Sequence, residues 1–127
     1  MKQLTEKQIV DNWNKLIQLI KDTFPEDYPN DRREKLLKMY HYFENRMSVA
    51  PASGKAAYHN AMVGGYVEHV LHVTDCALQI KKLWESNGAM INFTDEELVF
   101  AAMHHDLGKV GDLTEDYYIP QDSEWHR

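Results

Sequence analysis

The chain has 127 residues, of which 43% are hydrophobic and 27% charged, and its formal net charge is −6. This length supports one hydrophobic core but not two, and the composition excludes wholesale disorder, so we expect a single domain over residues 1–127. The acidic balance gives no electrostatic basis for a broad nucleic-acid-binding face. A phosphorylated substrate would therefore need a metal ion and a few cations placed at the site.

Cysteine usage and apolar runs predict the compartment. Cys76 is the only cysteine, which excludes an intramolecular disulfide and a Cys-x-x-Cys zinc or redox motif. The N-terminus has no apolar core of signal-peptide length, and no stretch approaches the roughly 20 apolar residues that a membrane span needs. We expect a protein of the reducing cytoplasm that has no membrane partner.

Two amphipathic helices are predicted in the N-terminal part, residues 1–50. A Thr-x-x-Gln capping box at Thr5, followed by apolar residues at helical spacing, predicts a first helix over about 5–23. The two prolines of FPEDYPND end this helix and form a turn. A second apolar series predicts a helix over about 31–47, and the proline- and glycine-containing stretch after it indicates a loop.

Two further helices are predicted in the central part, residues 55–113. A long apolar series predicts a well-buried helix over about 61–86, and two adjacent glycines near its start indicate that another backbone or a ligand comes close. A second capping box, at Thr94, opens a buried helix that runs to about His105. Aromatic residues on the helices are interpreted as core or half-buried packing: Trp13, Tyr40, Tyr66 and Trp84.

The C-terminal stretch, residues 114–127, is irregular in pattern, with a further helix predicted to begin at Ser123. Because no run of alternating polarity is long enough for a sheet, we predict an all-α fold, a compact bundle of about five to six helices. The chain stops at Arg127, where that last helix would begin, so we expect an incomplete gene product.

Five histidines lie in or beside the two central helices: His59, His69, His72, His104 and His105. Buried imidazoles and carboxylates cost free energy unless they are paired or bind metal. His105 and Asp106, at the end of one helix, can direct two donors at one ion while His69 supplies a third from the other helix. A hydrogen-bonded polar cluster is the alternative. His104 is expected to point away, because successive helical residues differ in direction by about a hundred degrees.

The segments AAYHNAMVGGYVEHVLHV and AAMHHDLGKVGDL together resemble the HD superfamily of metal-dependent phosphohydrolases, and most closely its branch with HD-domain 3′-5′ exoribonucleases. The resemblance covers residues 55–113 and implies the HD-domain fold. It also implies hydrolysis of a phosphate ester of a nucleotide or of a nucleic-acid end by a metal-activated water. Mixed histidine and carboxylate ligation implies one or two divalent transition-metal ions, chosen from Mn, Fe, Co, Ni and Zn.

The same resemblance implies roles for individual residues. His69, His105 and Asp106 would bind the metal, with Asp106 able to bridge two ions if two are bound. Lys109 would face the substrate phosphate and stabilise the negative charge that develops there during attack. His59, upstream of the Gly-Gly pair, would bind phosphate or the leaving group.

The sequence departs from the family pattern at its end. That pattern normally closes with a further Asp on a later helix, which this sequence does not place, and His126 is a candidate additional metal ligand there. A second hypothesis therefore stays open: a catalytically incomplete module of the same fold that binds metal and either nucleotide or a protein partner. A homodimer is left open as well.

Overall fold

The computed structural model describes residues 3–52 and 62–111, and all regular structure within these ranges is helical. The all-α prediction is confirmed. The described residues hold four α-helices, fewer than the five or six predicted, and the helix predicted from Ser123 lies outside the described ranges. The elements in chain order are α1 (Glu6–Thr23), the 3-10 turn η1 (Pro29–Asp31), α2 (Arg32–Met47), α3 (Gly65–Ser86), α4 (Asp95–His104) and the 3-10 turn η2 (Leu107–Val110).

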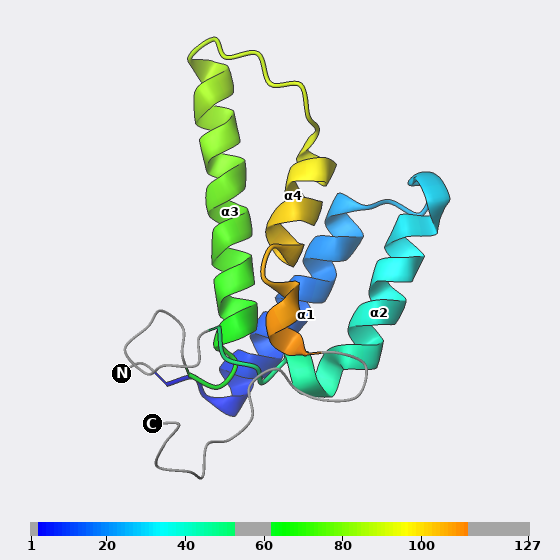
Figure 1. Ribbon diagram of the computed structural model, residues 1–127, viewed down its shortest axis with the longest axis vertical. Coiled ribbons are helices and arrows are strands. Elements are labelled where there is room, and N and C mark those ends of the chain that lie inside the picture. Colours follow the sequence, from blue (N-terminus) through cyan, green and yellow to red (C-terminus); the bar gives the residue numbers. More distant parts are fainter. Residues whose placement is uncertain (1–2, 53–61, 112–127) are drawn as a thin grey trace.

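The helices form a bundle in which α1 contacts each of the other three (Figure 1). Helix α3 also lies along α4, and this pair shares the most extensive contact in the fold. Apolar side chains from all four helices meet in one core, to which α1 contributes residues at helical spacing of three and four. The buried core comprises Trp13, Leu16, Ile20, Phe24, Leu36, Tyr40, Met47, Ala50, Tyr66, Val67, Val70, Val99, Met103 and Val110.

Both predicted capping boxes are present. The Thr5 hydroxyl accepts a hydrogen bond from the backbone N–H of Gln8 at 3.1 Å, and the Gln8 side chain accepts from the Thr5 N–H at 2.8 Å. The equivalent pair at the start of α4 is Thr94 with Glu97, at 3.1 and 2.9 Å. Each box satisfies two N–H groups that a helix start leaves without intrahelical partners, which is why the sequence alone locates these two ends.

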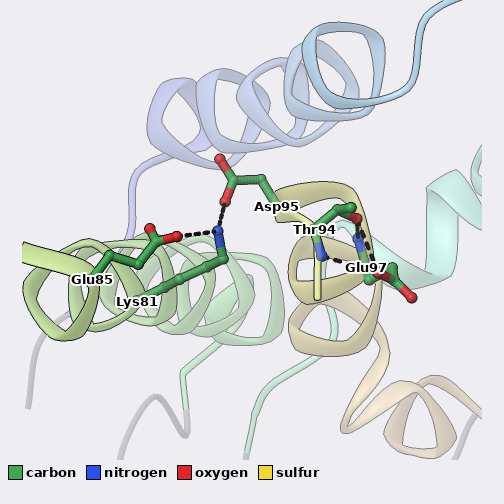
Figure 2. A network of polar contacts seen from close by, with 5 residues as sticks. All are labelled: Lys81, Glu85, Thr94, Asp95 and Glu97. Atoms are coloured by element: carbon green, nitrogen blue, oxygen red, sulfur yellow. Dashed lines mark hydrogen bonds and ion pairs between the residues drawn. The ribbon is translucent and has the colours of Figure 1, made fainter. Parts of the chain in front are cut away.

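An ion-pair network ties α3 to the start of α4 (Figure 2). The Lys81 ammonium lies 2.8 Å from the Asp95 carboxylate on α4 and 3.5 Å from Glu85 on its own helix. The Lys81 side chain is only 11% exposed, so its alkyl stem is covered while its charge reaches both carboxylates. This network holds the two helices together at the end of the bundle opposite the His-Asp dipeptide.

The start of α3 differs from the prediction. The helix begins at Gly65 rather than near residue 61, because Gly64 adopts a φ of +81° that no helix accommodates. The Gly64 N–H donates to the carbonyl of Val49 at 2.9 Å, and the N–H of Tyr66 donates to the carbonyl of Ala50 at 2.9 Å. These two bonds attach the first turn of α3 to the segment that follows α2.

The prediction that the whole of α3 is well buried is wrong for its C-terminal part. Ile80, Leu83 and Trp84 are 54%, 59% and 58% exposed, so Trp84 is neither core nor half-buried packing. Figure 1 shows the reason: this half of α3 extends beyond the other helices of the bundle. Within the described residues, no helix is long and apolar enough to cross a membrane.

Replacing Gly64 by Ala should destabilise the fold by about 2 kcal/mol or more, since a left-handed backbone costs an L-residue about 1–2 kcal/mol and contact adds to it. An added Cβ would lie 2.9 Å from Cγ1 of Ile9, which would have to shift. Urea denaturation measures the change. Gly88→Ala is the matched control, because Gly88 has a φ of +90° and its added Cβ meets no atom of the described residues within 4 Å. An equal decrease in the free energy of unfolding in both variants would show that the contact with Ile9 on α1 adds nothing to the cost at Gly64.

Candidate metal centre

Three candidate ligands, one on α3 and two directly after α4, meet at one end of the bundle. His69 lies in the second turn of α3, while His105 and Asp106 directly follow the last residue of α4. The two histidine Nε2 atoms are 3.4 Å apart, and the Asp106 Oδ2 atom is 3.0 Å from Nε2 of His105 and 3.6 Å from Nε2 of His69. Among residues 3–52 and 62–111, this is the one group of three or more metal-ligating side chains.

The extensive packing of α3 on α4 brings His69 to the dipeptide. His105 keeps helical dihedral angles, and the backbone then leaves the helix at Asp106, with φ −118° and ψ 21°. A turn follows, in which the Lys109 N–H donates to the Asp106 carbonyl at 2.9 Å. The end of α4 therefore turns two consecutive side chains toward the same point on α3.

The hydrogen bonding of His105 determines which ring nitrogen carries the lone pair that faces His69 and Asp106. Its Nδ1 lies 2.7 Å from the carbonyl oxygen of Ala102, and because a carbonyl only accepts, Nδ1 carries the hydrogen. In the neutral ring Nε2 then holds a lone pair, directed at the Asp106 carboxylate and at His69. Lone pairs that converge at about 3 Å repel one another unless a cation or an additional proton lies between them.

The neighbouring His104 also donates from Nδ1 to a backbone carbonyl, but its Nε2 has a partner outside the cluster. Its Nδ1 lies 2.6 Å from the carbonyl of Phe100, and its Nε2 accepts from the Tyr40 hydroxyl at 2.9 Å. Burial lowers the pKa of His104, and the nearby Arg32 charge lowers it further. His104 is therefore a half-buried, hydrogen-bonded residue that points away from the cluster, as expected, whereas the Nε2 of His105 faces the cluster.

The spacing of the donor atoms fits a transition-metal ion. Metal–ligand bonds to histidine nitrogen and carboxylate oxygen are about 2.0–2.2 Å, so ligand atoms at adjacent corners of a tetrahedron or octahedron lie about 2.9–3.6 Å apart. The three distances here run from 3.0 to 3.6 Å. Two imidazole nitrogens and one carboxylate oxygen also match the donor preference of Mn, Fe, Co, Ni and Zn ions.

Lys109 supplies the cation of the site. Its Nζ lies 3.4 Å from Oδ2 of Asp106, the same oxygen that faces both histidines, and it donates to the carbonyl of Ala52 at 2.9 Å. The short turn η2 places Lys109 three residues after Asp106, on the same side of the chain. The structure thus brings the fourth predicted residue to the cluster. His59 and His126 lie outside the described residues.

Tyr66 is a polar residue of α3 for which the sequence pattern predicts only a packing role. It lies one turn before His69 on α3 and is 1% exposed. Burial raises the pKa of Tyr66, and the negative charge of Asp106 raises it further, so its phenol lies within the electrostatic reach of the cluster. The i, i+3 spacing from His69 was the sequence signal, because residues three apart share a helix face.

Comparison of the chain with protein families, with curated proteins and with solved structures finds no match. The likeness to the HD superfamily thus rests on the two motifs. The geometry described above is independent of that likeness, since it follows from how α3 and α4 pack.

Proposed function

We propose that this chain is a metal-dependent phosphohydrolase of the HD type. His69, His105 and Asp106 would hold a divalent transition metal, and Lys109 would meet the substrate phosphate. The observation that carries this proposal is the convergence of three metal-ligating atoms, one from α3 and two from the residues that follow α4, at distances suited to one ion. The two sequence motifs, which overlap the start of α3 and the end of α4, support the same reaction class.

The proposed substrate is a phosphate ester of a nucleotide or of a nucleic-acid end. An ammonium group beside metal-ligating side chains suits a phosphate, whose several negative oxygens interact with both. The net charge of −6 favours a small substrate or a chain end over a long nucleic acid held along a surface. The single cysteine is the basis for proposing the cytoplasm as the compartment.

In the proposed mechanism, a divalent ion supplies Lewis-acid activation of a water and of a phosphoryl oxygen when it is bound. The protein residues prepare the site for this. The bond from Nδ1 of His105 to the Ala102 carbonyl holds the ring with Nε2 toward the cluster. The Asp106 carboxylate supplies a negative charge for the cation. The Lys109 ammonium stabilises the negative charge that develops on the phosphoryl oxygens during attack.

Elemental analysis tests the metal centre. After incubation with Mn²⁺, Fe²⁺, Co²⁺, Ni²⁺ or Zn²⁺ and removal of excess ion, wild type should retain about one ion per chain or more, since the centre has three ligands. His105→Ala should retain far less, because it removes one of these ligands. His41→Ala is the matched control: it removes an exposed imidazole on α2, away from the cluster. Wild type without metal would contradict the proposal.

Hydrolysis of phosphate esters tests the reaction class. Wild type loaded with its preferred ion should hydrolyse bis(p-nitrophenyl) phosphate or a nucleotide, and both a chelator and His105→Ala should abolish the activity. Bound metal with no hydrolysis of any ester would favour the alternative, a metal-binding module that is catalytically incomplete. The two assays therefore separate the metal centre from the enzyme.

A further inference from the structure

The hydroxyl of Tyr66 is a buried polar group that the proposed mechanism does not use. The side chain is 1% exposed, and within the described residues its oxygen has no hydrogen-bond partner. Native proteins rarely bury a hydroxyl in this way, because the group loses its bonds to water without replacement. A buried hydroxyl without a partner is therefore a candidate functional group, and this one belongs to a residue one turn before the candidate metal ligand His69.

Two polar residues interact electrostatically with Tyr66, although neither forms a hydrogen bond with its hydroxyl in this structure. One is Tyr40: burial raises the pKa of its hydroxyl, and the neighbouring Tyr66 raises that pKa further. The Tyr40 hydroxyl already donates its hydrogen to Nε2 of His104 at 2.9 Å, so its donor is in use. The other is Asp106, whose negative charge acts on Tyr66. A carboxylate accepts at two oxygens with about four lone-pair directions, so it is the stronger acceptor of the two.

The known contacts of Asp106 leave room for a further donor. Nε2 of His69, Nε2 of His105 and Nζ of Lys109 all face the same oxygen, Oδ2, at 3.6, 3.0 and 3.4 Å. A carboxylate that ligates a metal is commonly held in orientation by a hydrogen bond from a neighbouring side chain. Tyr66 belongs to the buried core and lies one turn before the candidate ligand His69 on α3.

We infer that Tyr66 is a positioning residue for the metal centre, its hydroxyl donating a hydrogen bond to the Asp106 carboxylate in the cation-binding form of the protein. This inference rests on the proposed metal site and assigns it a residue outside the HD-like ligand set. Tyr66 touches neither the ion nor the substrate in this role. It acts by holding Asp106 in the orientation that binds the cation.

The test compares Tyr66→Phe with Tyr40→Phe, two variants that each remove one hydroxyl from an equally buried ring. Isothermal titration with Mn²⁺ or Zn²⁺ measures metal affinity, and thermal unfolding in chelator measures the stability of the metal-free protein. Tyr66→Phe should weaken metal affinity about 10–100-fold, the usual effect of losing a group that orients a ligand. Its unfolding midpoint in chelator should stay unchanged or rise, because the variant removes an unsatisfied hydroxyl.

Tyr40→Phe should show the opposite pattern: a lower midpoint in chelator, because His104 loses its donor, with metal affinity within about twofold of wild type. Wild-type affinity in Tyr66→Phe would overturn the inference and leave the metal centre standing. A lower midpoint with unchanged affinity, or failure to fold, would also overturn it, since the hydroxyl would then be structural. If wild type itself binds neither ion, the metal centre and the inference fail together.

Discussion

Replacing Asp106 by Asn is expected to abolish metal binding without destabilising the metal-free protein. Oδ2 of Asp106 lies 3.0 Å from a lone-pair nitrogen of His105, whereas an Asn amide can donate to that nitrogen. The ion pair with Lys109 is partly exposed, so its loss costs about 0–1 kcal/mol. We expect metal affinity to fall by more than about 100-fold, the upper end for losing a group that only orients a ligand. The unfolding midpoint in chelator should stay unchanged or rise.

This combination of results separates a metal centre from the polar-cluster alternative. In a purely structural cluster, a protonated histidine would pair with Asp106, and Asp106→Asn would lower the unfolding midpoint. Asp95→Asn is the matched control, because it removes a carboxylate from the other end of α4, where Asp95 pairs with Lys81 at 2.8 Å. That variant should keep full metal binding. A destabilised Asp106→Asn protein, together with a wild type that binds no metal, would favour the structural cluster.

Local features of the fold could be predicted because their physics is local. The capping boxes at Thr5 and Thr94 involve residues three apart, so sequence spacing alone decides them. The end of α4 at His104 lies within one residue of the prediction. The start of α3 was misplaced because the left-handed conformation of Gly64 depends on bonds and contacts with α1 and with the segment after α2.

Burial could be predicted only where a partner helix exists. The apolar spacing of Ile80, Leu83 and Trp84 is that of a packed helix face. These residues are nevertheless exposed, because this end of α3 extends beyond the other helices. Helix length can be read from the sequence, but the length of overlap between two helices depends on the whole bundle. A pattern of apolar residues shows which face can pack, and it does not show what packs there.

For the candidate site, the residue types could be predicted from the sequence, whereas the geometry could not. His69, His105 and Asp106 could be singled out as residue types, since imidazoles and a carboxylate on apolar helices need a partner. Their distances of 3.0–3.6 Å depend on how α3 packs on α4, which no spacing within one helix determines. Tyr66 was interpreted as packing because a buried aromatic residue on an apolar face looks the same whether or not its hydroxyl has a role.

Replacing Lys109 by Met is expected to lower the turnover of a phosphate ester by about 10²–10³-fold, the usual effect of removing one group that stabilises transition-state charge. Met retains much of the alkyl chain and removes only the ammonium, which lies 3.4 Å from Asp106. Metal content should stay at the wild-type value, because Lys109 is not a ligand. The measurements are kcat and KM at saturating metal, with elemental analysis of the same samples.

Lys82→Met, which removes an exposed cation from α3, is the control and should retain wild-type kcat. A second comparison isolates the structural part of the effect, because Lys109 also donates to the Ala52 carbonyl at 2.9 Å. Lys109→Arg keeps the charge, so it should retain more activity than Lys109→Met even if that bond is perturbed. A Lys109→Met protein with unchanged kcat would limit Lys109 to holding the segment around Ala52, and the phosphate would then need another cation.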